Sequence, residues 1–230
     1  GLFQYDLHGK LIKQFKHNPS DNTSLFDRSN AILSMSYDQG DTIWLGTSDG
    51  PGFFNKVTKQ FYRVPIDIKY DPNNWKNVPD VMKDRQGILW FVLNGNGLVW
   101  YNPEDHTYKQ YQHNPGDSTS LTSDRIVSVF EDKSGVIWVG DIAGGVNRLD
   151  RVHDTFKHYI RSIPCHRFFE DSEGMLWVGT GNGPYRYHPN EDKFLPFFDP
   201  ESDAGHLNII NIIEDDERNL WMHNDSELIR

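Results

Sequence analysis

The chain repeats one short phrase five times, and this repetition limits its fold more than any other feature of the sequence. In each copy an aspartate stands six residues before a tryptophan. The five pairs are Asp38 and Trp44, Asp84 and Trp90, Asp132 and Trp138, Asp171 and Trp177, and Asp215 and Trp221. Successive tryptophans are separated by 46, 48, 39 and 44 residues. Self-similarity at a period of roughly 40–50 residues is typical of arrays and propellers.

One repeat, residues 125–159, shows which elements the phrase joins. Residues 125–131 alternate apolar and polar side chains, as a strand does when one of its faces is buried. A polar turn at 132–135 leads to the β-branched segment 136–140, and two further short segments complete four predicted strands. No segment shows a sustained helical period. The pattern predicts an all-β fold, a β-propeller of four-stranded antiparallel blades; a solenoid is disfavoured because its coils are shorter.

The predicted blades make the whole chain, 1–230, one β-propeller segment. Whole blades are expected at 30–77, 78–124, 125–163 and 164–206, with partial blades at 1–29 and 207–230. The chain opens on a predicted third strand and ends on the start of another, so a closed five-bladed ring would supply that strand twice. We therefore expect a piece of a longer propeller, with a closed ring as the alternative. Its open edges would pair with the remaining blades of the parent protein or with a second copy.

The repeated tryptophans and aspartates are expected to be structural. A tryptophan at a fixed place in every blade can fill the gap between neighbouring sheets, which contributes about 2–3 kcal/mol of burial each. The aspartate is expected to bond the backbone amides of the turn. The alternative, a catalytic or metal-binding set of aspartates, is disfavoured because the five lie in separate blades. We therefore predict no metal site, no cofactor and no catalytic residues.

Composition excludes two classes of partner. The net charge is −10 and the isoelectric point about 5.4, so the surface repels phosphate and nucleic-acid binding is not expected. The sequence has no run of 18 apolar residues, so no membrane span is predicted. Cys165 is the single cysteine, which excludes an internal disulfide.

The repeats resemble the two-component regulator propeller repeat. The strongest matches are SLTSDRIVSVFEDKSGVIWVGDIAGGVNRLD (120–150) and FEDSEGMLWVGTGNGPYRYHP (169–189), and FKHNPSDNTSL (15–25) recurs as YQHNPGDSTSL (111–121). One departure is Arg218, which replaces the turn glycine of the last copy. The resemblance implies the periplasmic sensor region of a hybrid two-component sensor of the Bacteroidetes type. It also implies a seven-bladed propeller and a histidine kinase outside this chain.

Candidate binding residues lie in the long, variable loops between blades and between second and third strands, which share one face of a propeller. Tyr70 and Trp75 stand among asparagines in the longest of these loops, a combination that suits carbohydrate, although Trp75 could instead close the loop onto its blade. Arginines and a histidine could receive the carboxylate or sulfate of an acidic sugar, or be ordinary rim charges. The predicted ligand-binding residues are Tyr70, Asn74, Trp75, Asn94, Asn96, Arg125, Asp141, Arg161, His166, Arg167 and Asn182.

The sequence therefore predicts a non-catalytic propeller that senses an oligosaccharide or another small ligand. One alternative is a propeller-fold polysaccharide lyase or hydrolase, for which His166 with Tyr159 is the only candidate pair. A second alternative is a structural scaffold for protein–protein interaction. The segment GTGNGP (179–184) resembles a phosphate-binding loop, but it joins two predicted strands, so it does not indicate a nucleotide site.

Overall fold

The computed structural model describes residues 1–37, 40–71, 74, 76–224 and 228–229. These residues form short antiparallel sheets, with one 3-10 turn, η1, at Asp203–His206. The chain divides into two compact units, Gly1–Gln110 and Tyr111–Arg230. Within the described ranges, no helix has the length and apolar character that crossing a bilayer demands. The predicted all-β class is confirmed.

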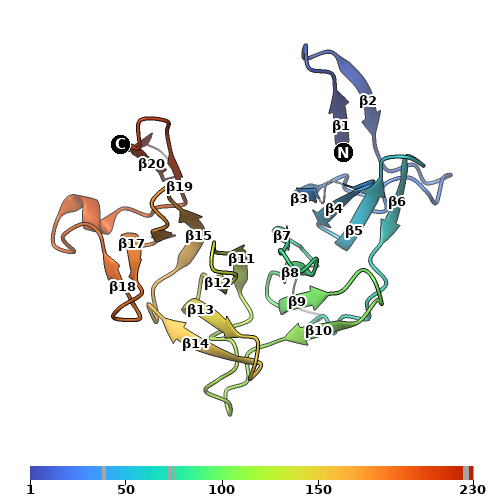
Figure 1. The fold of residues 1–230 in the computed structure, drawn as a ribbon. Coiled ribbons are helices and arrows are strands. Elements are labelled where there is room, and N and C mark those ends of the chain that lie inside the picture. The colour runs from blue at the N-terminus through green and yellow to red at the C-terminus, as the bar shows by residue number, and fades with distance from the viewer. Residues whose placement is uncertain (38–39, 72–73, 75, 225–227, 230) are drawn as a thin grey trace. The chain divides into compact units, whose positions relative to one another are not determined.

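The first unit contains a two-stranded sheet followed by two four-stranded sheets (Figure 1). In each sheet the strands follow one another as an antiparallel meander, as the repeat predicted. The strands are β1 (Leu2–Tyr5) and β2 (Leu11–Phe15); β3 (Ile32–Tyr37), β4 (Thr42–Thr47), β5 (Gly50–Asn55) and β6 (Gln60–Arg63); and β7 (Asp80–Lys83), β8 (Leu89–Leu93), β9 (Gly97–Tyr101) and β10 (Tyr108–Tyr111).

The second unit contains two four-stranded sheets and a sheet with three described strands (Figure 1). Its third sheet supplies its own third strand, β21, which pairs with β20, the strand that carries Trp221. The strands are β11 (Ile126–Glu131), β12 (Ile137–Asp141), β13 (Gly145–Asp150) and β14 (Thr155–Tyr159); β15 (Cys165–Glu170), β16 (Leu176–Thr180), β17 (Gly183–His188) and β18 (Lys193–Pro196); and β19 (Asn211–Glu214), β20 (Leu220–His223) and β21 (Leu228–Ile229).

Within each unit the first strands of successive blades lie side by side, β3 beside β7 and β11 beside β15. Ser34 Oγ donates to Val78 O at 3.1 Å across this contact. The glycine two residues after the repeated tryptophan permits the approach. A Cβ on Gly46 would lie 2.2 Å from Val78 O, and one on Gly179 would lie 2.4 Å from Ile209 O. A larger residue at Gly46 or Gly179 would push the neighbouring blade away, which explains the glycine in these copies of the phrase; Val92 and His223 stand at this place in two others.

One aspartate both closes the repeated turn and holds the tryptophan. Oδ1 of Asp132 accepts the amide N–H groups of Ser134 and Val136 at 2.9 and 3.0 Å, while Oδ2 accepts the indole N–H of Trp138 at 2.7 Å. The same three bonds recur at Asp84, Asp171 and Asp215. The predicted bonds to the turn amides are therefore confirmed, and the bond to the indole explains the six-residue spacing.

The turn keeps its geometry where the sequence departs from glycine. Gly135 has φ of 84°, and Arg218 at the same place in the last copy has φ of 66°, a left-handed value that costs a non-glycine residue some strain. Several hydrogen bonds lower the pKa of Asp215 to about 2, and the bond from the indole N–H of Trp221 has the largest effect. Asp38, the aspartate of the first copy, lies outside the described residues.

Four of the repeated tryptophans are buried: Trp44, Trp90, Trp138 and Trp177 are 6%, 3%, 1% and 4% exposed. Burial against the following blade of the same unit is confirmed for Trp44, Trp138 and Trp177. Trp221 is only half-buried, contrary to the prediction, because no sheet follows its own within the described part of the chain.

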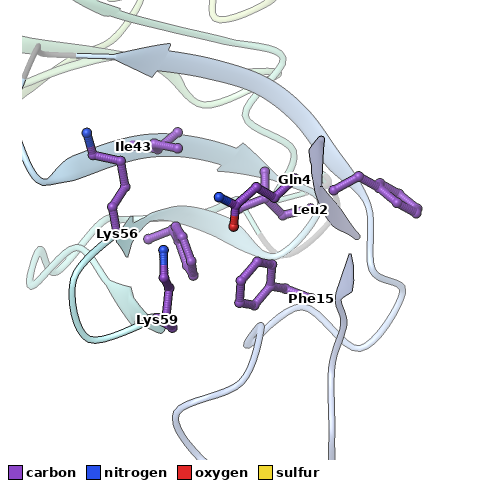
Figure 2. Close-up of a pocket in the computed structure, with 8 residues that line it drawn as sticks. Leu2, Gln4, Phe15, Ile43, Lys56 and Lys59 are labelled. Carbon is purple, nitrogen blue, oxygen red and sulfur yellow. The ribbon is translucent and has the colours of Figure 1, made fainter. Parts of the chain in front are cut away.

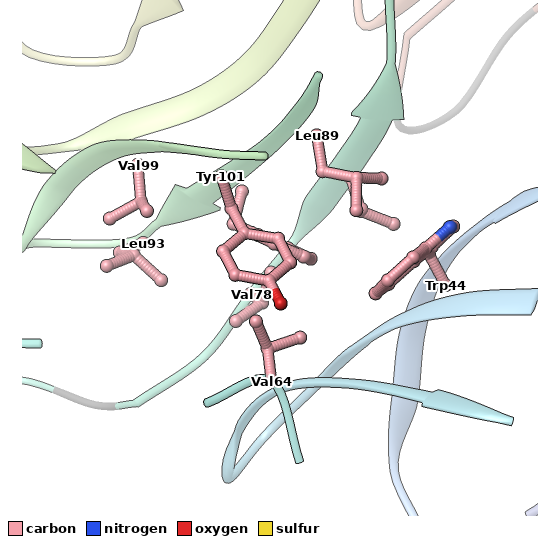
Figure 3. Packing of buried hydrophobic residues seen from close by; sticks show 9 residues of the cluster. Trp44, Val64, Val78, Leu89, Leu93, Val99 and Tyr101 are labelled. Carbon is pink, nitrogen blue, oxygen red and sulfur yellow. The ribbon is translucent and has the colours of Figure 1, made fainter. Parts of the chain in front are cut away.

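In the first unit, Trp44 fills the space between the two four-stranded sheets (Figure 3). Its indole packs with Val64, which directly follows β6, and with Leu89 and Tyr101 of the next blade. The Tyr101 hydroxyl contacts Nδ1 of His106 at 2.5 Å. We refer to Trp44, Val64 and Tyr101 as the valine joint, because an aliphatic side chain directly follows the fourth strand here.

In the second unit, the corresponding contact is aromatic and polar. The Trp138 ring lies 5.6 Å from the ring of Tyr159 in its own blade and 4.9 Å from that of Tyr187 in the next. Both tyrosine hydroxyls donate to Asp192 Oδ1 at 2.6 Å. We refer to Trp138, Tyr159, Tyr187 and Asp192 as the tyrosine joint.

Asp192 is the one carboxylate of the tyrosine joint, and cations surround it. Arg148 donates to its Oδ1 at 3.0 Å, and Lys157 donates to its Oδ2. Burial favours the neutral acid, but the bonds from Lys157 and the two tyrosines outweigh it and hold the pKa of Asp192 well below its usual range. Burial and the bond to Asp192 raise the pKa of the Tyr159 hydroxyl.

Candidate functional site

A pocket of about 110 Å³ lies where the β4–β5 turn meets the connection between β6 and β7. The two segments form a parallel bridge at Asp49 and Lys76. Their meeting agrees with the prediction that second-to-third-strand turns and inter-blade loops share a face. Apolar and polar side chains both line the pocket; the lining residues are Asp49, Gly50, Pro51, Arg63, Val64, Ile66, Ile68, Tyr70 and Lys76.

The charged groups of this pocket are arranged around Asp49. Arg63 donates from Nη2 to the Asp49 carboxylate and from Nη1 to Asp49 O at 2.7 Å. Asp49 N donates to Thr47 Oγ1 at 3.0 Å, which fixes the turn. The Lys76 ammonium lies 5.3 Å from the centre of the Tyr70 ring. The pocket therefore presents a neutralised Arg–Asp pair beside an additional cation.

Tyr70 forms one wall of the pocket. Burial, and secondarily the Asp49 carboxylate, raise the pKa of Tyr70 to about 12, so the hydroxyl remains a neutral donor and acceptor at ordinary pH. A Cβ on Gly50, whose φ is 103°, would lie 3.2 Å from this hydroxyl. Gly50 thus serves the turn and leaves the hydroxyl uncovered on that side. A half-buried aromatic ring that ends in a hydroxyl group can contact both the apolar and the polar face of an amphipathic ligand.

The loop that carries Tyr70 is held by the outer strand of the next blade. The Tyr108 hydroxyl accepts from Asp67 N at 3.1 Å, and Gln110 bonds both Lys69 N and Lys69 O at 3.2 Å. Gln110 also donates to Asn96 O at 2.9 Å. Side chains of β10 therefore substitute for a further strand and order the loop, which preorganises the pocket.

A second hollow of about 180 Å³ lies in the second unit beside the repeated loop 113–121. His158 contacts Ser120 O through Nε2 at 2.7 Å, and its Nδ1 contacts Arg161 Nη2 at 3.3 Å. His113 contacts Leu121 O through Nδ1 at 2.7 Å. Because carbonyl oxygens accept hydrogen bonds, these contacts set the proton on Nε2 of His158 and on Nδ1 of His113.

The two copies of this loop share their internal bonds, but the residue that follows each copy differs. Phe26 follows Leu25 in the first copy, and its ring lies under the Arg63 guanidinium at 4.4 Å and fills the space above Gly52. Thr122 occupies the same place in the second copy; its hydroxyl donates to Asp141 and its backbone N–H donates to Asn147. The smaller threonine leaves the second hollow open.

The structure brings four predicted residues of the first unit together. Asn74 Nδ2 donates to Gly95 O at 2.6 Å, and Asn96 Oδ1 accepts from Asp71 N at 2.7 Å, so Tyr70, Asn74, Asn94 and Asn96 belong to one loop cluster. Asn96 is fully buried and faces the loop interior rather than a ligand. Trp75 lies outside the described residues, and its predicted role stays a prediction.

The predicted residues of the second unit do not converge. Arg161 lines the second hollow, whereas His166 bonds Asn208 through Nε2 at 2.8 Å. Asp141 is fully buried and accepts from Thr122 and Ser123, so it orders a loop. The remaining three are exposed on separate segments: Arg125, Arg167 and Asn182.

Sequence reasoning missed Arg63, Asp49 and Lys76. Arg63 lies on a predicted fourth strand, at the position that Gln110 and His158 occupy in the next two blades. The side chains of Arg63, Gln110 and His158 each contact a loop that belongs to or precedes their own blade. This recurring polar position is the signal that could have identified Arg63. The alternative catalytic pair is not assembled, because Tyr159 donates to Asp192 and His166 bonds Asn208. No three potential metal ligands cluster in the described part of the chain.

Residues 120–142 match the family model described as two component regulator propeller. A curated relative, histidine kinase P4 of Formosa agariphila, is 30% identical over 207 residues, which cover 83% of this chain and 15% of the relative. The chain thus spans a small part of that relative's length.

Solved structures share the fold. The extracellular domain described as that of a hybrid two component system from B. thetaiotaomicron has a TM-score of 0.69 at 23% identity, covering 86% of this chain and 28% of that one. A virginiamycin B lyase from Staphylococcus aureus has a TM-score of 0.62 at 16% identity, covering 86% of this chain and 64% of the lyase. With the four-stranded antiparallel sheets, these likenesses identify the fold as a β-propeller.

Proposed function

Since the chain carries a two-component regulator propeller repeat at 120–142, we propose that it forms part of the ligand-sensing region of a hybrid two-component sensor. The region lies in the periplasm, and the histidine kinase belongs to another part of the parent protein. The match to a histidine kinase relative supports this assignment. Sensing requires a ligand site on the loop face, and the site proposed here is the pocket of about 110 Å³ that Asp49, Arg63, Tyr70 and Lys76 help to line, called the Tyr70 pocket below.

The proposed ligand is an oligosaccharide. Pyranose rings have an apolar face and a rim of hydroxyl groups. The pocket matches this with the apolar side chains of Ile66 and Ile68 and with the Tyr70 hydroxyl and the Arg63–Asp49 pair. Lys76 suits a carboxylate or sulfate on the sugar. The observation that carries the proposal is this convergence of apolar and polar groups on a loop ordered by β10.

Binding to a panel of neutral and acidic oligosaccharides, with chromatography of the sugars afterwards, tests the proposal. Removing the hydroxyl in Tyr70→Phe, or the cation in Lys76→Ala, is expected to weaken binding about 5–10-fold, as the loss of one hydrogen bond or ion contact does. Trp75→Ala is expected to weaken binding with little change in melting temperature.

The matched control is Tyr62→Phe, because the Tyr62 hydroxyl is exposed and bonds Gln60 outside the pocket. The control should bind as the native chain does. Binding by both Tyr70→Phe and Lys76→Ala equal to that of the native chain would refute the site. Shortened sugars in the chromatogram would instead support a lyase or hydrolase, and no binding to any sugar would support a scaffold.

A further inference from the structure

A hollow of about 160 Å³ lies between the β1–β2 hairpin and the first four-stranded sheet (Figure 2). Its walls are mostly carbon, with amine and amide groups at the edge. The lining residues are Leu2, Phe3, Gln4, Phe15, Ile43, Phe54, Lys56 and Lys59. A carbon-lined cavity of about 150 Å³ is large enough to hold an aromatic ring.

The repeat shows what occupies the same place in other blades. In the second unit, Trp138 lies opposite Arg148, which stands three residues after Gly145 at the start of a third strand. Gln4 stands three residues after Gly1 in β1, which is also a third strand. Gln4 therefore faces the position that a tryptophan occupies in a complete blade.

The remaining walls correspond one by one to the residues around Trp138. Phe15 pairs with the second residue of its third strand, as Tyr159 does. Lys59, like Asp192, is the residue of positive φ in the turn before the fourth strand. The counterparts are Phe15 and Tyr159, Phe54 and Tyr187, Ile43 and Leu176, and Lys59 and Asp192. All four counterparts belong to the buried surroundings of Trp138.

We propose that this hollow is a socket for the tryptophan of another repeat of the parent protein, carried by a strand that pairs with β1. In the described part of the chain β1 pairs with β2 alone, so its other edge presents backbone donors and acceptors that a strand can bond. Phe3 and Tyr5 on β1 are 48% and 56% exposed, and a further strand and its neighbour would cover them. The curated relative is far longer than the matched segment, so it has room for such a repeat.

The chemistry of the socket selects an indole over a polar ligand. Phe15 and Phe54 replace the tyrosines of the tyrosine joint, so the two hydroxyls that bond Asp192 have no counterpart here. Lys56 lines the hollow, but its ammonium donates to the Tyr37 hydroxyl at 3.0 Å and lies over that ring. The occupant is therefore bound by ring contacts and by backbone pairing with β1.

The chain itself supplies a matched donor for the test. Residues 125–144 hold the first two strands that precede Gly145, so a copy of 125–144 fused directly before Gly1 places a tryptophan opposite Gln4. This fusion is expected to melt about 5 °C or more above the same fusion with alanine in place of the copied tryptophan. It is also expected to slow hydrogen exchange of the outward amides of Leu2–Tyr5. The same segment as a free peptide should bind the unfused chain at least tenfold more tightly than its alanine version.

Three outcomes would overturn the proposal. The first is equal melting of the tryptophan and alanine fusions together with equal binding of the two peptides. The second is a dimer of the unfused chain that dissociates in Trp221→Ala, since a second copy would then be the occupant. The third is binding of free indole or a sugar by the tryptophan fusion that is as tight as binding by the unfused chain. The hollow would then be a ligand pocket that the tryptophan does not fill.

Discussion

The valine joint and the tyrosine joint follow one plan but obtain their stability from different chemistry. Both place the indole of one blade against the sheet of the next. In the valine joint Val64 directly follows the fourth strand and the contact with Tyr101 is apolar, whereas in the tyrosine joint Tyr159 and Tyr187 converge on an ionised Asp192. The shared arrangement therefore fixes where the indole lies. The residues that replace one another around it decide whether the surroundings depend on charge.

The largest expected effect tests what the joints share. Trp138→Ala removes a side chain that is 1% exposed and is expected to lower the free energy of unfolding by about 3–5 kcal/mol. Trp44→Ala in the valine joint should cost a similar amount, because the indole is similarly buried. Denaturant unfolding of both variants measures this. A loss below about 1 kcal/mol at either site would break the shared plan.

A smaller effect separates the joints. Tyr159→Phe keeps the ring beside Trp138 but removes one of the two hydroxyls that donate to Asp192. The expected loss is about 1–2 kcal/mol, typical of a hydrogen bond to a charged group. Tyr62→Phe, which removes an exposed hydroxyl of the first unit, should stay within about 0.5 kcal/mol of the native chain. Equal losses in the two variants would mean that the Asp192 contacts add nothing to the tyrosine joint.

The smallest effect concerns pH. The pKa of Asp192 is lower in the folded chain than in the unfolded chain, so its stabilising contribution is complete above the ordinary carboxyl pKa of about 4 and is lost as the pH falls below that value. Asp192→Asn should therefore melt below the native chain at pH 6, and the difference should begin to shrink as the pH falls below about 4 and should vanish only once the pH falls through the much lower folded pKa. Melting curves across this range measure it. A difference that stays constant would show that Asp192 acts without its charge.

The blades could be predicted because their signals are local. Trp138 and Asp132 lie in one turn and its strand, so period, spacing and alternation predicted both the strand and the buried indole. The indole–carboxylate bond was not predicted, because a turn signature does not show where the second oxygen points. Asp192 was missed since its partners, Tyr159 and Arg148, belong to another blade.

The pocket was only partly predictable for the same reason. Tyr70 was identified from the composition of its own loop. Arg63 and Asp49 were not identified, because they lie on other segments of the chain. The bridge between Asp49 and Lys76 brings these segments to the pocket. Candidates chosen for side-chain type alone, such as Asp141, are buried and support loops. Residue type identifies chemistry, but contacts between repeats determine which side chains meet.

Much of the wall around Trp44, Trp138 and Trp177 belongs to the blade that follows each of them, and this arrangement has a genetic consequence. A tandem duplication of one repeat, 39 to 48 residues by the spacing of the tryptophans, would add an indole and a wall in the same event. The new wall would cover the preceding indole, and the new indole would meet the wall that was already there. Because each repeat carries both halves of the contact, copies can be gained or lost in whole numbers while residues such as Val64 and Tyr159 diverge afterwards.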